Sequence, residues 1–297
     1  MQHSAPHNPM NPSPIANLLT FDIEGFIEAS HDSMHVPQKY ISTELEREEI
    51  ELNTHGILDL LAETRQTATF FVLGRIARDL PALVRRIVGD GHELGCHSFY
   101  HRRLHFLSPQ ELREQLGDAK RNLEDIAGSP IYGFRAPDFS ITTANLWAFD
   151  VLRELGFSYD SSVYPTSLHD AYGIATFPRV PFRMPNGLVE IPMTTARILG
   201  KNVPFGGGGY MRLYPLWLTR MLFRHANREG LPVNVYFHPS EMGIVVRRIE
   251  ELPWLRKFRT YVGVQTTARK LRALIRSFCF ARVIDYLNSN PIPEVVT

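Results

Sequence analysis

The chain has 297 residues, of which 44% are hydrophobic, so it is long enough to bury a large core. Its 32 Lys and Arg against 31 Asp and Glu leave a formal charge of +1, which excludes net charge as a reason to expect a nucleic-acid partner. Two widely separated cysteines, Cys96 and Cys279, exclude a disulfide framework and a cysteine-rich metal site.

The N-terminal residues 1–16 are rich in Pro, Asn and Ser and lack the apolar core of a secretory signal. We expect them to form a flexible tail before a single domain over 17–297. No apolar run approaches the ~20 residues that a membrane-spanning helix needs. We therefore expect no integral membrane segment and a cytoplasmic location, while a homo-oligomer stays open.

The first predicted strand carries two acidic residues in the stretch LTFDIEG, residues 19–25. Side chains alternate along a strand, so Asp22 and Glu24 share one side while Phe21 and Ile23 point to the other. Two carboxylates on one face of a mostly apolar strand require partners. The following residues, 26–43, are expected to be irregular.

Helical and extended patterns then alternate along the chain. Ser108 and Glu111 form a capping-box pattern that predicts the start of one helix. Helices are expected over 44–63, 80–91, 108–128, 142–156 and 216–230, and strands or strand ends over 68–74, 92–98, 131–139, 157–165 and 232–239. This alternation predicts βα units with a mainly parallel sheet and right-handed crossovers.

Polar residues fall at or just beyond the C-terminal ends of the predicted strands. In α/β proteins the loops after parallel strands meet at one end of the sheet, where active sites form. The residues in question are Asp22, Glu24, His97, His101, Arg135, Asp160 and His238. We expect these separate segments to meet in one site.

The segment HSFYH places His97 and His101 four residues apart, on one face if the segment turns helical. Two histidines and one carboxylate, from Asp22 or Glu24, form an open site for Zn²⁺ or a similar divalent ion. His105 continues the spacing, but on a helix it would lie about 12 Å from His97, too far to share the ion.

Four other positions have competing interpretations. Cys96 would point away from His97 on a strand and is expected to be a buried apolar residue. Arg135 is a candidate carboxylate partner in the active site. Asp160 could equally form a turn. His238 ends a strongly β-prone run, which favours a general acid over a packed histidine.

The glycine tract FGGGGY, residues 205–210, lacks the ending of a phosphate-binding loop. We expect a flexible loop or a close backbone approach to substrate. The C-terminal part is locally basic between residues 247 and 272. Such a run is usually a solvated face, and the alternative is a surface that meets an anionic carrier or a membrane.

The ordered series TFDIE, HSFYH, RAPDFS, YDSS and VYFHP resembles the polysaccharide deacetylases of the nodulation-protein type, carbohydrate esterase family 4. The chain is most similar to the branch found in exopolysaccharide loci that also encode exosortase systems. The resemblance extends from about Asn17 to the C-terminal helix. It implies an α/β fold, a distorted (β/α) barrel of about seven units, fewer than the eight of a full barrel.

The resemblance also implies a ligand set. His97 and His101 match the two histidine ligands of the family. The usual carboxylate ligand directly follows the catalytic aspartate, but that position is Ile23 here. A related form of the motif places the ligand one residue further, which implies Glu24 as the third ligand of a divalent metal, zinc foremost.

The catalytic roles follow from the same comparison. Asp22 matches the catalytic base, Arg135 the arginine that pairs with it, and His238 the catalytic acid. Asp160 matches the acid of the fourth motif. The resemblance further suggests substrate contacts through two other residues, which are Pro137 and Tyr210.

The implied activity is metal-dependent hydrolysis of an N-acetyl group on an amino sugar, in an N-acetylated oligo- or polysaccharide such as an exopolysaccharide or its precursor. Two alternatives stay open. One is a metal-independent amidohydrolase of the same fold that acts on small cyclic ureides, and the other is a non-catalytic glycan-binding protein.

Overall fold

The computed structural model describes residues 15–27, 36–168 and 173–294. Its main sheet has nine strands in the order β10-β1-β2-β3-β4-β5-β7-β6, with β11 also paired to β1. Only β6 and β7 pair antiparallel in this sheet. The strands are β1 (Asn17–Ile23), β2 (Thr69–Val72), β3 (Glu93–Cys96), β4 (Gly133–Phe134), β5 (Tyr159–Asp160), β6 (Phe182–Arg183), β7 (Val189–Glu190), β10 (Asn234–Phe237) and β11 (Phe280–Ala281).

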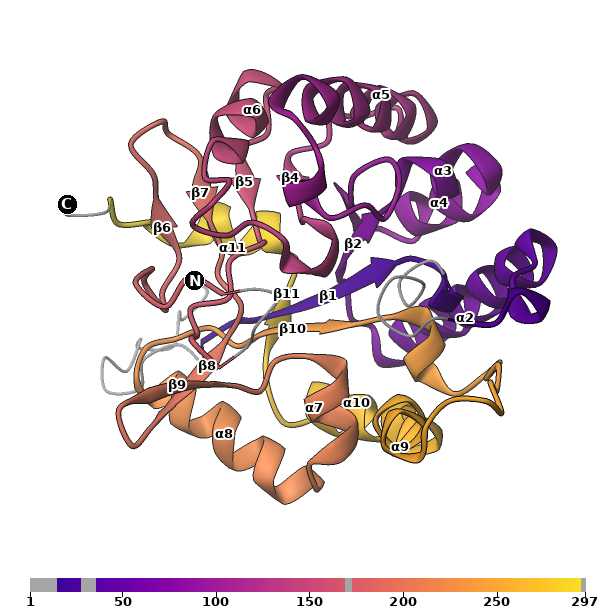
Figure 1. Cartoon of the computed structure of the whole chain (residues 1–297). Helices are drawn as coiled ribbons and strands as arrows, with labels where there is room; N and C mark the ends of the chain where they lie inside the picture. The colour runs from indigo at the N-terminus through magenta and orange to yellow at the C-terminus, as the bar shows by residue number, and fades with distance from the viewer. Residues whose placement is uncertain (1–14, 28–35, 169–172, 295–297) are drawn as a thin grey trace, which may run out of the picture.

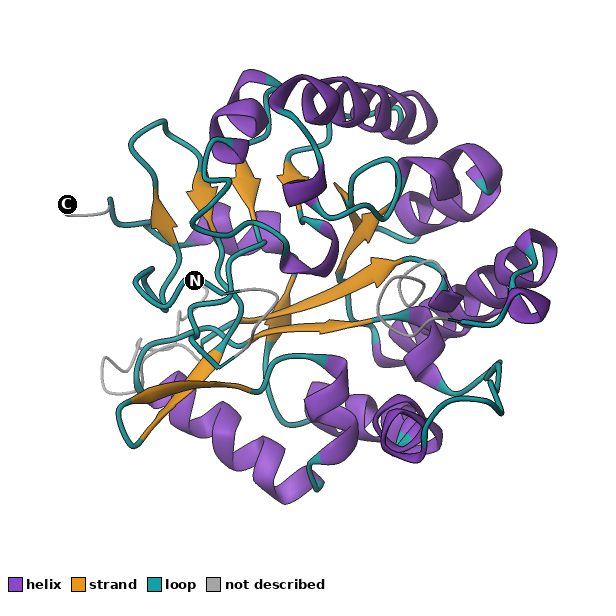
Figure 2. Cartoon of the chain, viewed as in Figure 1, coloured by secondary structure: helices purple, strands orange, loops and turns teal. Residues whose placement is uncertain are grey.

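The sheet curls, and helices cover its outer side (Figure 1, Figure 2). A separate antiparallel pair is formed by β8 (Thr195–Ile198) and β9 (Lys201–Pro204). The helices are α2 (Thr43–Thr64), α3 (Gly74–Asp79), α4 (Pro81–Gly89), α5 (Pro109–Ala127), α6 (Ala148–Glu154), α7 (Gly208–Leu213), α8 (Leu216–Arg228), α9 (Trp254–Tyr261), α10 (Thr267–Ile275) and α11 (Val283–Ser289). The predicted fold, a distorted (β/α) barrel with mainly parallel strands, is confirmed.

The strand β1 lies at the centre of the fold, and all its residues are buried. Phe21 stacks on Phe70 of β2, with ring centroids 5.1 Å apart, and also packs against Phe237 of β10. Burial of each such side chain contributes about 1.5–3 kcal/mol. The core therefore fixes the face of β1 that carries Phe21 and Ile23, and this leaves the acidic residues on the other face.

The predicted starts of α2 and α5 agree with the structure. Ser108 caps α5, since its hydroxyl accepts a hydrogen bond from the Glu111 amide at 3.2 Å and its amide donates to the Glu111 carboxylate at 2.8 Å. Such a capping box satisfies two amides that the helix leaves unpaired. Ser42 caps α2 in a similar way, through the Leu45 amide.

Other elements differ from the sequence-based expectations. The helix expected over 142–156 begins only at Ala148, because the Asn145 side chain accepts from the Thr142 amide and holds a turn before it. The short strands β6 to β9 were not predicted. The proposed tail over 1–16 lies almost entirely outside the described residues, as do 28–35 of the segment expected to be irregular.

Strand pairing joins the two halves of the chain, because β1 pairs with β10 on one side and with β2 and β11 on the other. The single domain over 17–297 stays a prediction. None of the helices in the described ranges has the length and apolar character that a membrane crossing requires.

Candidate active site

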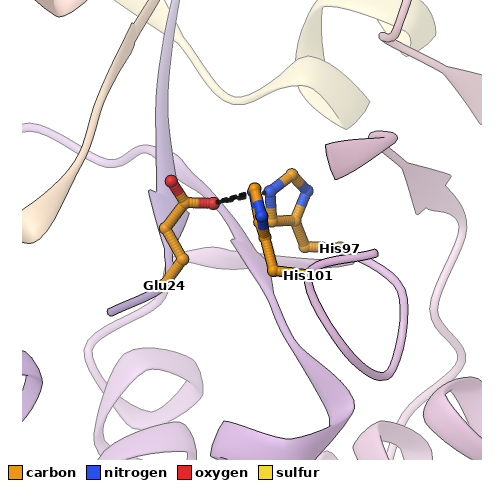
Figure 3. A group of neighbouring side chains, drawn as sticks. All are labelled: Glu24, His97 and His101. Carbon is orange, nitrogen blue, oxygen red and sulfur yellow. Dashed lines mark hydrogen bonds and ion pairs between the residues drawn. The ribbon is translucent and has the colours of Figure 1, made fainter. Parts of the chain in front are cut away.

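Three side chains from two strand ends converge on one point (Figure 3). Glu24 follows β1, while His97 and His101 follow β3. The Oε2 atom of Glu24 lies 3.0 Å from His97 Nε2 and 2.8 Å from His101 Nε2. The three ligand atoms all lie within 4.8 Å of one another, so they could bind a single metal ion.

The two histidines do not share a helix, contrary to the expectation from their spacing. The segment after β3 is a loop, and Ser98 adopts a left-handed conformation with φ 74°. A positive φ is costly for a residue other than glycine and often marks a functional site. The turn at Ser98, and not helical periodicity, directs both rings toward Glu24.

The donor atoms fit a cation. Nδ1 of His97 donates to the Arg135 carbonyl at 2.8 Å, so in the neutral ring the Nε2 lone pair faces the Glu24 carboxylate. Two acceptors in contact need a proton or a metal ion between them. A backbone acceptor on the distal nitrogen is also the usual way to orient a metal-binding histidine.

The charge of Glu24 is compensated within the protein. Burial opposes ionisation of this carboxyl group, but His101, His238 and His97 together lower its pKa well below the usual range. Glu24 is therefore a carboxylate, as a metal ligand must be.

Asp22 forms a buried ion pair with Arg135, the largest fully buried side chain of the described residues. Arg135 Nη1 donates to Asp22 Oδ1 and to Thr20 Oγ1, both at 2.7 Å, and Arg135 Cζ lies 4.3 Å from the centroid of the Phe71 ring. Nε and Nη2 donate to Ser161. These contacts offset the cost of burying the guanidinium and hold Asp22 in one position.

His238 follows β10 and completes the group. Its Nε2 atom lies 3.3 Å from Glu24 Oε1, and its Nδ1 lies 3.1 Å from Glu241 Oε2. Burial disfavours the imidazolium, yet the Glu24 and Glu241 carboxylates outweigh it and raise the pKa of His238 to about 10. The structure thus places a proton donor beside the candidate metal ligands.

Two residues that the sequence analysis missed support His238. Glu241 lies in the 3-10 helix Pro239–Met242, and its Oε1 accepts from Arg212 Nε at 2.9 Å. Burial raises the pKa of Glu241, but His238 and Arg212 together lower it to about 2. The sequence signal was the three-residue spacing in HPSE, which resembles a capping box: Glu241 also accepts from the His238 amide at 3.0 Å.

The glycine tract packs against Glu241 and strand β10. The expected flexible loop is wrong, since residues 204–208 are buried and α7 begins at Gly208. A Cβ added at Gly208 would lie 1.9 Å from Glu241 Oε2, and one at Gly207 would lie 2.6 Å from the Tyr236 hydroxyl. The glycines allow close approach to β10 and Glu241.

We expect Gly208→Ala to lower the free energy of unfolding by about 1–3 kcal/mol, because the new methyl group must displace the Glu241 carboxylate. Gly209→Ala is the matched control. Its Cβ would lie 3.9 Å from Arg212 Nη2, an ordinary van der Waals contact, and alanine favours a helix. Urea unfolding of both variants checks this. Equal stability of the two variants would contradict the packing argument.

The structure does not bring Asp160 into this group of contacts. Its oxygens accept from the Ser162 hydroxyl at 2.6 Å and the Ser162 amide at 3.0 Å, as in a turn. It also pairs with buried Glu190, and burial together with the Asp160 charge raises the pKa of Glu190 well above its usual range. Glu190 therefore holds the proton of the pair. A catalytic role for Asp160 stays a prediction.

Neither of the two predicted substrate contacts lines the pocket that opens beside Glu24 and His238. Pro137 is buried at the start of the 3-10 helix Pro137–Phe139, in which Asp138 and Phe139 both have positive φ. Tyr210 is half-buried on α7 and packs against Tyr214. Their roles stay predictions.

Two other residues lie as the sequence predicts. Burial raises the pKa of the Cys96 thiol to about 12, consistent with a buried apolar residue. His105 packs on Phe106 and is not part of the ligand group.

A pocket of about 320 Å³ opens beside Glu24 and His238. Asp138 and Tyr261 line its wall, together with Arg212 and Glu241. Its position next to the candidate ligands makes it the expected place for a substrate.

The fold and the site define a (β/α)-barrel protein with a candidate metal centre. Residues 30–159 match the polysaccharide deacetylase family, and residues 161–288 match a domain of unknown function, DUF3473. Over residues 30–159 the chain is therefore similar to the polysaccharide deacetylase family. The first match contains His97, His101 and Arg135, while His238 lies in the second.

A curated relative shows a similar likeness. The chitooligosaccharide deacetylase of Sinorhizobium fredii is 36% identical over 100 residues, which cover 33% of this chain and 44% of that protein. The chain thus spans less than half the length of this curated relative.

Two solved structures share the fold. A Mycobacterium smegmatis protein assigned as a polysaccharide deacetylase has a TM-score of 0.66 and 20% identity, with 100% of this chain and 98% of that one covered. An allantoinase has a TM-score of 0.62 and 17% identity, with 96% and 93% covered. At these identities the likeness shows the fold alone.

Proposed function

We propose that this chain is a metal-dependent hydrolase that removes the N-acetyl group from an amino sugar of an exopolysaccharide or its precursor. One observation carries the proposal: Glu24, His97 and His101 meet next to His238. Glu24 is also only two residues from Asp22, which pairs with Arg135. This arrangement combines a ligand set, a carboxylate base and an imidazole acid, which amide hydrolysis requires.

Each group has one task in this proposal. Glu24, His97 and His101 would hold a divalent ion, zinc by ligand type, which polarises the acetyl carbonyl and acidifies water when bound. Asp22 accepts a proton as water attacks the carbonyl carbon. Arg135 fixes the Asp22 carboxylate. His238 donates a proton to the sugar nitrogen as the C–N bond breaks, so that acetate and a free amine are released.

Glu241 determines which nitrogen of His238 faces the site. Because its carboxylate accepts from Nδ1, a proton for the leaving amine must come from Nε2, which is directed toward Glu24. The curated relative that acts on chitooligosaccharides and the resemblance to the exopolysaccharide branch support an N-acetylated sugar as the substrate.

The test is release of acetate from a panel of N-acetylated oligosaccharides by the purified chain. We expect turnover on at least one member, loss of turnover after treatment with a chelator, and recovery when zinc is added back. Circular dichroism before and after chelation serves as a control for unfolding.

Other outcomes would favour the alternatives. Turnover that survives chelation, with cyclic ureides as substrates, would indicate the metal-independent amidohydrolase. Binding of an oligosaccharide with metal present and no release of acetate would indicate a glycan-binding protein.

A further inference from the structure

Helix α9 exposes its apolar residues to solvent. None of its residues is buried, and Trp254, Leu255 and Phe258 have 78%, 51% and 50% of their surface exposed. An amphipathic helix on a globular protein normally packs this face against the core. A contiguous group of large exposed apolar side chains instead marks a surface that binds something.

The apolar and basic residues of α9 are segregated. At about 100° per residue, Trp254, Leu255 and Phe258 fall within about 100° of one another around the helix axis. Arg256, Lys257 and Arg259 lie outside this arc. In the described part of the chain, Lys257 pairs with Glu250, whereas no carboxylate forms an ion pair with Arg256 or Arg259.

This combination matches the chemistry of an anionic lipid surface. Tryptophan, phenylalanine and leucine enter the boundary between headgroups and acyl chains, while Lys and Arg pair with anionic headgroups. A second copy of the chain is a poorer occupant, since a two-fold interface through α9 would bring the same arginines together. Figure 1 shows α9 at the border of the molecule.

The helix is connected to the active site. Arg259, Thr260 and Tyr261, in its last turn, line the same pocket as Glu24 and His238. Arg212 Nη1 donates to the Thr260 carbonyl at 2.7 Å while its Nε donates to Glu241, the carboxylate that holds His238. A surface bound to α9 would therefore lie beside the mouth of the pocket.

We propose that α9 is an interfacial helix that docks this chain on an anionic lipid bilayer, and that the sugar it deacetylates is carried on a membrane lipid. The second part rests on the proposed function, whereas the docking does not. It also gives a role to the part of the basic C-terminal segment that lies on α9, whereas Arg247 and Arg272 of that segment pair with Glu49 and Glu63.

The docking is tested by co-sedimentation with vesicles of equimolar phosphatidylglycerol and phosphatidylcholine, and with vesicles of phosphatidylcholine alone. We expect the unmodified chain to bind the anionic vesicles. The double variant Trp254→Ala, Phe258→Ala should bind them about tenfold or more weakly. Leu52→Ala on α2 is the matched control, because Leu52 is 44% exposed but flanked by Glu48 and Glu51.

Charge is tested separately with Arg256→Glu, compared with Arg85→Glu at an exposed position of α4. Only the first should weaken binding, by about tenfold or more, since charges near a lipid surface act over about one Debye length. Equal loss in both variants, or no binding by the unmodified chain, would overturn the docking. Concentration-dependent dimerisation without vesicle binding would identify a second copy as the occupant instead.

The substrate is tested with N-acetylglucosamine on a polyprenyl diphosphate in the same vesicles, against free N-acetylglucosamine oligomers. We expect faster acetate release from the lipid-carried sugar than from the free oligomers. The variant with Trp254→Ala and Phe258→Ala should lose this advantage, while its turnover of the free oligomers stays unchanged. Vesicle binding without any hydrolysis would leave the docking in place and reject the proposed function. Hydrolysis of free oligomers without vesicle binding would support the proposed function and reject the docking.

Discussion

Asp22→Asn is expected to reduce kcat for acetate release by about 10³-fold, because the amide cannot accept the proton of the attacking water. Asparagine keeps an oxygen that accepts from Arg135 Nη1, so the pair geometry is nearly preserved. The candidate metal ligands are unchanged. Turnover is measured with the oligosaccharide identified as substrate, and bound zinc is measured on the same sample.

A structural role for Asp22 must be separated from a catalytic one. Removing one partner of a buried ion pair costs about 3–5 kcal/mol, so the variant must be shown to be folded by urea unfolding. Thr20→Val is the matched control, since Thr20 also accepts from Arg135 Nη1 but carries no charge. We expect Thr20→Val to retain most of its turnover. Comparable losses in the two variants would show that Asp22 acts only through Arg135.

The general architecture was predictable because it depends on short-range patterns. Apolar runs separated by amphipathic segments determine the βα alternation, and Ser108 with Glu111 determines where α5 begins. Strand alternation likewise predicted that Phe21 and Ile23 face the core while Asp22 and Glu24 do not. The position of polar residues at strand ends then indicated one common site.

Other features depend on contacts between distant residues, which a single sequence does not contain. The spacing of His97 and His101 suggested a helix, but the left-handed turn at Ser98 produces the same convergence in a loop. The requirement for Gly208 arises only because Glu241, far along the chain, occupies the space of a side chain. Likewise, the apolar face of α9 would have been predicted as buried from its pattern alone.

The position of Ile23 explains why Glu24 is the candidate ligand. Ile23 has no exposed surface and belongs to the main core, so an acid there would have to leave the core to reach the histidines. Glu24 lies one residue further, at the strand end, where its longer side chain contacts both His97 and His101. Glu24 therefore has the contacts that a ligand needs.

Glu24→Gln is expected to weaken zinc binding by about a hundredfold or more, because it removes the only charged member of the three-ligand group. Asp22→Asn should lower zinc affinity by no more than about tenfold, the low end of the cost of changing a residue that orients a metal ligand, because Asp22 pairs with Arg135 and is not in the ligand group. The two variants remove the same charge at positions two residues apart, one in β1 and one directly after it. Titration of each against a zinc-binding dye gives the affinity directly.

The paired result distinguishes base from ligand without relying on turnover. Adding excess zinc should restore part of the activity of Glu24→Gln, because the fraction of protein with bound zinc limits its turnover. It should restore none of the activity of Asp22→Asn, because proton transfer limits turnover in that variant. Loss of zinc in Asp22→Asn together with retention in Glu24→Gln would exchange the two assignments. His97→Gln should resemble Glu24→Gln, since its Nε2 contacts the same carboxylate oxygen, and a normal zinc affinity in that variant would show that the ion binds elsewhere.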